Sequence, residues 1–262
     1  MIKTAFLAWQ DPTSRTWWPI GRLSHEDGVF RFVYTRGAQK SKDFSPLGMF
    51  PSLDQSYESD SLFPIFANRL LPATRPEYRD FVTWLNIPHS EHDPVAILSR
   101  TGGLRATDSL EMFPCPEPLP SGEYVVHFFV RGIRHLPQPI VSERVSKLAV
   151  GERLYLLADI QNQHDPLALA IRSSEPVLII GYCPRYLTPD ANALVHDGSE
   201  SIVKVERVNV DAPYQLRLLC SLTTSWPDGF VPCSSELYQP LASLDNPVRV
   251  QAADEATGPA SH

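Results

Sequence analysis

The sequence has no run of about 18 apolar residues, so we expect no transmembrane helix. It also lacks the apolar core of a signal peptide, because Trp9, Gln10 and Asp11 follow too soon after the start. Both absences predict a cytoplasmic protein that makes no membrane contact.

Basic charge is scarce as well: 23 Lys and Arg stand against 30 Asp and Glu, a net charge of −7 over 262 residues. A protein that coats duplex nucleic acid usually presents a basic surface, because neutralising phosphates dominates its affinity. The acidic balance excludes that class, and it confines any nucleic-acid contact to a small local pocket.

Paired cysteines are absent. The chain has four cysteines, none in a CxxC pair: Cys115, Cys183, Cys220 and Cys233. In a cytoplasmic protein this spacing predicts free thiols in preference to a structural zinc site. We expect no bound metal and no cofactor.

The familiar catalytic motifs are missing too. The sequence has no GxxxxGK[ST] loop, no GxGxxG after a strand, no GxSxG, no HExxH and no kinase HRD or DFG. The pair Gly102–Gly103 follows a predicted helix, which favours a helix stop over a phosphate loop. His89 and His92 have i, i+3 spacing but fall in a polar loop, which is favoured over a metal site. These absences predict a protein that is not an enzyme.

Proline is abundant, with 25 residues against 13 glycines, and four prolines lie between Phe113 and Gly122. Neither a helix nor a central strand runs through such a segment, so it marks a domain boundary. We predict a first domain at 1–114, a linker at 115–122, a second domain at 123–245 and a disordered tail at 246–262.

The pattern of residues predicts an α+β, β-rich protein. Aromatic and branched residues predict strands at 4–10, 18–24 and 29–35, and helices follow at 75–86 and 93–101. The second half carries six strand candidates separated by turn residues, which favours a closed barrel or a sandwich: 124–130, 152–158, 167–172, 177–182, 201–210 and 214–222. A short helix is predicted at 187–196.

The stretch NQHDPLALAI, residues 162–171, interrupts this apolar half with polar residues. Asn162, His164 and Asp165 admit three interpretations: a metal or catalytic cluster, an ordinary turn, or part of a binding surface. Taken alone, Asn162 and Asp165 are natural turn formers, because Asx side chains bond to nearby backbone.

Three ordered blocks give the stretch a context: VRGIRHLP, then LAVGERLYLLADIQNQHDPLALAI, then IIGYCPRYL. Together they resemble the HIRAN domain over Glu123 to Ser221. The resemblance implies a small barrel related to the OB type that binds a single-stranded DNA 3′ end, or another nucleic acid, in a pocket.

The resemblance also implies roles for particular residues in this pocket. Arg134 would contact the backbone and His135 would stack on a base, while Leu136 replaces a second aromatic residue of the family. Asn162 and Asp165 would bind the terminal nucleotide. Asp165 is the candidate for a free 3′ hydroxyl, because a carboxylate accepts from a hydroxyl and repels a phosphate.

Three more residues complete this predicted site. Tyr182 and Arg185 match the positions that contact base and phosphate, and Tyr214 matches a late aromatic residue that closes the pocket. His164 is not part of it.

The first half has a resemblance of its own. Residues 2–114 resemble the N-terminal subdomain of HipA-type proteins, with Arg69 and Ala73 as departures. The resemblance is carried by Phe66, Asn68, Leu70, Leu71, Pro72, Asp93, Leu98, Gly102 and Gly103. No kinase core follows, so the resemblance implies a protein-interaction module for a HipA-like kinase or another protein, and no kinase activity.

The sequence therefore predicts a HipA-N-like small β unit with helices followed by an OB-like HIRAN β-barrel. Our leading hypothesis is a non-enzymatic adaptor that recognises single-stranded DNA. The main alternative is a regulatory subunit that binds a HipA-like kinase in a toxin–antitoxin or defence system, without DNA binding. A third is an enzyme whose site we do not recognise.

Overall fold

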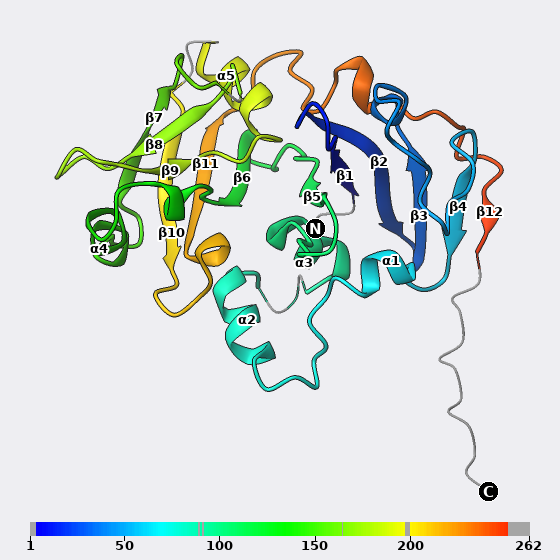
Figure 1. The fold of residues 1–262 in the computed structure, drawn as a ribbon, viewed down its shortest axis with the longest axis horizontal. Coiled ribbons are helices and arrows are strands. Elements are labelled where there is room, and N and C mark those ends of the chain that lie inside the picture. Colours follow the sequence, from blue (N-terminus) through cyan, green and yellow to red (C-terminus); the bar gives the residue numbers. More distant parts are fainter. Residues whose placement is uncertain (1–3, 89, 91, 164, 197–199, 251–262) are drawn as a thin grey trace, which may run out of the picture. The chain divides into compact units, whose positions relative to one another are not determined.

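The computed structural model describes residues 4–250 apart from 89, 91, 164 and 197–199. The chain folds into two compact units (Figure 1). The first unit is made of three segments: the N-terminal segment as far as Pro72, residues 91–115, and the segment that begins at Ser234. The second unit is made of two segments, Ala73–Ser90 and Pro116–Cys233. Both units are rich in β-structure and short of helix, as predicted.

The first unit is built on a six-stranded sheet in the order β12-β4-β3-β2-β1-β5. Its strands are β1 (Thr4–Gln10), β2 (Trp17–Glu26), β3 (Val29–Tyr34), β4 (Ser56–Ser59), β5 (Leu110–Pro114) and β12 (Val248–Arg249). All neighbours are antiparallel except β12 and β4. The three predicted strands of this half are confirmed as β1, β2 and β3.

Alternation along β1 separates the two faces of this sheet. Ala5 and Leu7 join an aromatic core that includes Phe32, Phe50 and Phe66. This core is covered by α3 (Pro94–Thr101) and by the single turn of α1 (Pro64–Ala67), which both contribute buried residues to it.

Helix α3 has the predicted boundaries. The Asp93 side chain accepts a hydrogen bond from the Val95 amide at 2.8 Å, and Pro94 occupies the first turn. The helix ends at Gly102. The φ angles of Gly102 and Gly103 are 81° and 55°, left-handed values that favour glycine. The interpretation of this pair as a helix stop is confirmed.

The C-terminal segment belongs to the first unit, which corrects two predicted boundaries. Residues 234–245 do not extend the second domain: Tyr238, in η5 (Glu236–Tyr238), packs its ring edge-on against Phe6. Residues 246–250 are ordered, since Val248 pairs with Tyr57 and the Val250 amide donates to the Glu58 carbonyl at 2.8 Å. Residues 251–262 lie outside the described part of the chain. The sequence pattern does not reveal this segment, because backbone hydrogen bonds that need no apolar run help to hold it.

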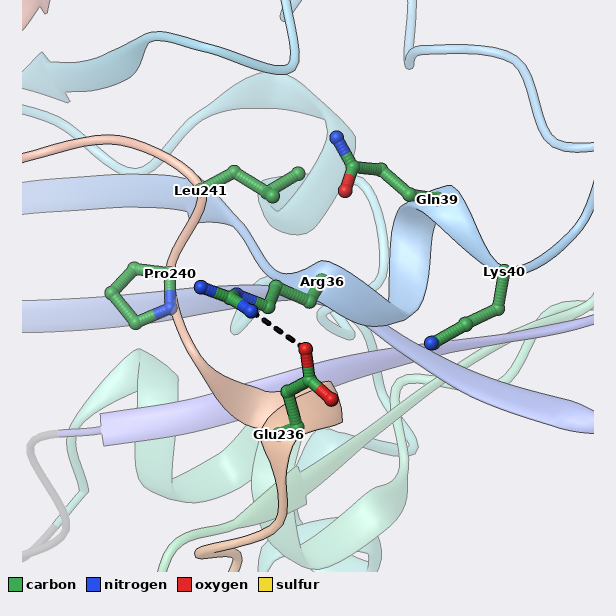
Figure 2. A pocket seen from close by; sticks show the side chains of 6 residues that line it. All are labelled: Arg36, Gln39, Lys40, Glu236, Pro240 and Leu241. Atoms are coloured by element: carbon green, nitrogen blue, oxygen red, sulfur yellow. Dashed lines mark hydrogen bonds and ion pairs between the residues drawn. The ribbon is translucent and has the colours of Figure 1, made fainter.

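The same segment forms one wall of a hollow of about 390 Å³ (Figure 2). Arg36, in η1 (Arg36–Gln39), bonds through Nη1 to Glu236 Oε1 at 2.6 Å across it. Lys40, Gln39, Pro240 and Leu241 complete the lining.

Helix α2 (Tyr78–Leu85) was placed in the first domain by the predicted boundary at 114, and the structure assigns it to the second unit. Asn209 attaches it there, because its Nδ2 donates to the Trp84 carbonyl at 3.1 Å. This bond spans 125 residues of sequence, so no local pattern predicts it.

The second unit is a curled antiparallel sheet in the order β6-β11-β10-β7-β8-β9. Its strands are β6 (Glu123–Phe129), β7 (Arg153–Ala158), β8 (Leu169–Arg172), β9 (Ile179–Tyr182), β10 (Ile202–Val208) and β11 (Leu218–Ser225). All six strands predicted for this half are confirmed. Several boundaries differ by a few residues. The largest difference is in β11, which begins at Leu218, because the expected first residues form the 3₁₀ turn η4 (Tyr214–Leu216).

The two ends of this sheet meet at a bridge between Arg131 and Tyr182, which follow β6 and end β9. Their backbones exchange two hydrogen bonds of 2.9 Å. Alternating residues of the strands fill the interior, among them Tyr124, Val126 and Phe128 of β6. Two helices, α4 (Ile140–Ser146) and α5 (Thr188–His196), add to this core; α5 overlaps the predicted helix, and α4 was not predicted.

The four cysteines, all among the described residues, form no disulfide, as predicted. Cys183 and Cys220 are buried in the second unit, and burial raises the pKa of the Cys183 thiol to about 12. Among the described residues, no helix is long and apolar enough to cross a membrane.

Gly181 provides a test of the bridge. A Cβ at this position would lie 2.2 Å from Val130 Cγ1 and 2.8 Å from the Arg131 carbonyl oxygen. We expect Gly181→Ala to lower the free energy of unfolding by about 1–3 kcal/mol, as overpacking does. Urea unfolding followed by circular dichroism measures this. Gly48→Ala is the matched control because no atom lies within 4 Å of its Cβ position. Equal stability of the two variants would contradict the bridge as a tight contact.

Candidate functional site

The site is built on the loop that joins β7 to β8. The loop is closed by the Asp159 amide, which donates to the Ala168 carbonyl at 2.9 Å, and by the Ala168 amide, which donates to the Asp165 carbonyl at 3.1 Å. These bonds hold the ends of the loop together, with Asn162 and Asp165 between them.

Asn162 and Asp165 are both turn formers here. Asn162 Oδ1 accepts from the Asp165 amide at 3.0 Å, and Asp165 Oδ1 accepts from the Leu167 amide at 2.9 Å. Each side chain thus uses one oxygen for the turn. The second oxygen of Asp165 faces the next element of the site.

That element is Arg185, which follows β9. Its Nε lies 3.9 Å from Asp165 Oδ2, and the side chains of Arg185 and Asp165 are 37% and 16% exposed. A pair of this length and exposure adds little to stability. It does place a cation and a carboxylate side by side at the surface, where both can contact a ligand.

Asp159 is a site residue that sequence reasoning missed. Its Oδ2 accepts from Asn162 Nδ2 at 3.1 Å and from the Tyr182 hydroxyl at 3.2 Å. Burial, followed by the charge of Asp159 and this hydrogen bond, raises the pKa of Tyr182. The sequence holds a partial signal, since Asp159 precedes Asn162 by three residues, the spacing of a local side-chain bond. The hydrogen bond between Asp159 and Tyr182 could not be predicted from the sequence.

The VRGIRH segment lies against Tyr182 through the bridge with Arg131. Gly132 has a φ of 75°, and a Cβ there would lie 3.3 Å from Cδ2 of the Tyr182 ring. The turn that follows, η3 (Ile133–His135), exposes Arg134 and His135. Arg134 Nε donates to His135 Nε2 at 3.0 Å, so the two side chains lie together.

The position at which the sequence departs from the family pattern, Leu136, and the predicted site residue Tyr214 are outside this group of contacts. Leu136, which replaces an aromatic residue, packs against the core of the second unit. Tyr214 is 39% exposed, and its ring lies 5.0 Å from the guanidinium carbon of Arg217. Within the described part of the chain, no hydrogen bond, ion pair or ring contact joins Tyr214 to the other predicted site residues.

The metal interpretations have no support from the described residues, which contain no group of three or more His, Cys, Asp or Glu able to hold an ion. His164 and His89 lie outside the described residues. A second hollow of about 470 Å³ is lined by residues 73, 75, 76 and 78–80, and neither hollow includes a predicted site residue.

The structure therefore joins Asn162, Asp165, Tyr182 and Arg185 by direct contacts that include Asp159. Arg134 and His135 follow the segment bridged to Tyr182. These residues include two arginines, an imidazole, a tyrosine ring and carboxylates, of which Arg134 and His135 are exposed. Such side chains can contact phosphate, stack on a flat ring and accept hydrogen bonds.

The chain was compared with known proteins. No curated protein matches it. Among solved structures, a protein from Lactobacillus plantarum is 21% identical with a TM-score of 0.32, covering 39% of this chain and 97% of its own. The HIRAN domain of human HLTF is 13% identical with a TM-score of 0.30, covering 40% of this chain and 81% of its own.

Both TM-scores are low, so these two likenesses carry no argument. The HIRAN domain family model matches residues 124–227. This span agrees with the resemblance found in the sequence over Glu123 to Ser221, whereas the HipA-like first half stays a prediction. Residues 124–227 of the second unit form a HIRAN domain.

Proposed function

We propose that the HIRAN domain binds single-stranded nucleic acid, with a preference for DNA carrying a free 3′ end, and that the chain is a binding adaptor without catalysis. The observation that carries the proposal is the contact network of Asp159, Asn162, Asp165, Tyr182 and Arg185. Through Asp159 it joins Asn162, Asp165, Tyr182 and Arg185, which the family resemblance assigns to one pocket.

Each group has a role that its chemistry permits. Arg185 and Arg134 are exposed enough to neutralise phosphates, and His135 and Tyr182 offer rings to bases. Tyr214, the last of the site residues predicted from the sequence, would contact the nucleic acid only if the bound strand extends to η4. Binding of this kind is local, which agrees with the net charge of −7.

Asp165 supplies the end preference. Its carboxylate accepts from a hydroxyl, while a 3′ phosphate would place like charges together. The neighbouring Arg185, 3.9 Å away, can then serve the penultimate phosphate without neutralising Asp165 fully.

The first unit would contact a protein, as the HipA resemblance implies, with a HipA-like kinase as one partner. The ordered helix stop at Gly102–Gly103 agrees with the pattern of that family. If the adaptor hypothesis fails, regulation of such a kinase without DNA binding is the alternative, and a stoichiometric effect on the kinase would support it.

Removal of two arginines tests the phosphate contacts. We expect Arg134→Ala combined with Arg185→Ala to weaken binding of a labelled single strand with a free 3′ hydroxyl. Each lost phosphate contact on a single strand reduces the slope of log K against log salt by roughly 0.7. Fluorescence anisotropy over a salt series measures both effects. Arg75→Ala with Lys147→Ala removes the same charge from two exposed positions elsewhere in the unit and should leave the slope unchanged. Equal slopes in the two double variants would contradict the proposal.

Asp165→Asn tests the end preference. The amide oxygen can still accept from the Leu167 amide, so the turn is kept while the charge is lost. We expect the variant to bind strands with a 3′ phosphate more tightly than the wild type does, and to discriminate less between the two ends. Affinities for a 3′ hydroxyl strand, a 3′ phosphate strand and a duplex with only a 5′ overhang measure this. Wild-type protein that binds all three equally would count against end recognition.

A further inference from the structure

A second arrangement of aromatic and basic side chains lies outside the predicted site, on β7 and β8. The guanidinium carbon of Arg172 lies 4.5 Å from the centroid of the Tyr155 ring, and that of Arg153 lies 5.4 Å from it. Tyr155 and Arg172 are direct cross-strand partners. Two cations therefore share one tyrosine ring.

Strand register places this group on the outer face of the sheet. Leu154 and Leu156 pack on the core, so the alternating residues Tyr155 and Leu157 point away from it. Arg172 pairs with Tyr155 and is on the same face.

The same face carries Tyr182 of the candidate site. Ala170 pairs with Leu157 on β7 and with Tyr182 on β9, which are the two neighbours of β8 (Figure 1). From Tyr182 to Tyr155 the path crosses two strand spacings and two residues along β8, which is on the order of 12 Å. The strand register thus places the two rings on the same face of the sheet.

The surface between the two rings is suited to a base. Leu157, between them, is 47% exposed, and an exposed apolar side chain there offers contact to a flat ring. Arg153 pairs with Glu200 at 3.0 Å, but both side chains are largely exposed, so the pair contributes little and can open. Ala170 itself is buried, so Leu157 supplies the exposed apolar contact between the two rings.

We propose that Tyr155, Arg153 and Arg172 form a second stacking position for single-stranded nucleic acid, on the 5′ side of the end held at Asn162, Asp165 and Tyr182. Guanidinium planes and aromatic rings both stack on bases, and the two positive charges also face the phosphates. The inference depends on the proposed function and extends it from a pocket for the 3′ end to a longer binding track, which runs from Asn162, Asp165 and Tyr182 to Tyr155, Arg153 and Arg172. It predicts that longer strands bind more tightly than short ones.

The experiment compares oligothymidylates of about three and about twelve nucleotides, lengths that bracket the smallest site sizes of OB-type domains. Tyr155→Ala should weaken binding of the longer strand by roughly 5- to 100-fold, the range that one stacked base provides, with a much smaller loss for the short strand. Tyr155→Phe keeps the ring and should restore most of the affinity. Arg185→Ala should weaken both lengths.

A second measurement tests the proposal without a Tyr155 variant, in case Tyr155→Ala does not fold. A 2-aminopurine base placed several nucleotides from the 3′ end should be quenched on binding to the wild type and less quenched with Arg172→Gln. Equal affinity of the wild type and Tyr155→Ala for the longer strand, or no quenching by the wild type, would overturn the track and leave the end site standing. Wild-type protein that binds neither length would overturn the end site and the track together.

Discussion

The second unit depends on the backbone contact between Arg131 and Tyr182. Two hydrogen bonds of 2.9 Å join the first and last strands of the sheet. They form only because Gly181 has no side chain to strike Val130 and the Arg131 carbonyl. The contact that curls the sheet also brings the VRGIRH segment to Tyr182, and Tyr182 to Asp159. Fold closure and assembly of the candidate site therefore have one cause.

The carboxylates of the candidate site hold its local structure. Asp159 holds Asn162 and Tyr182, and Asp165 holds the turn while its other oxygen faces Arg185. On an acidic chain, such carboxylates keep anions away except where an arginine is within reach. Under the proposed function, Arg134 and Arg185 would be the local positions for phosphates. Local contact of this kind would favour one strand over coating of a duplex.

Local signals were sufficient for most of the fold. Sequence patterns predicted all six strands of the second unit and three of the first, but not β4, β5 or β12. Asp93, Pro94 and Gly102 predicted both ends of α3. The turn and site interpretations of Asn162 and Asp165 are compatible, since each uses one oxygen for the turn. Long-range contacts could not be predicted: Asp159 to Tyr182 spans 23 residues, and Asn209 to Trp84 spans 125. Neither leaves a periodic pattern in the sequence.

The return of residues 234–250 to the first sheet has a consequence for folding during synthesis. The Arg36 amide needs the Gln239 carbonyl, and β4 needs β12, so the first unit is incomplete until the ribosome has made the whole HIRAN segment. Domains usually fold in the order in which they are translated. Here the first unit, whose translation begins first, can complete its fold only after the second. The HIRAN domain can therefore reach its native state before β12 is available to the N-terminal sheet.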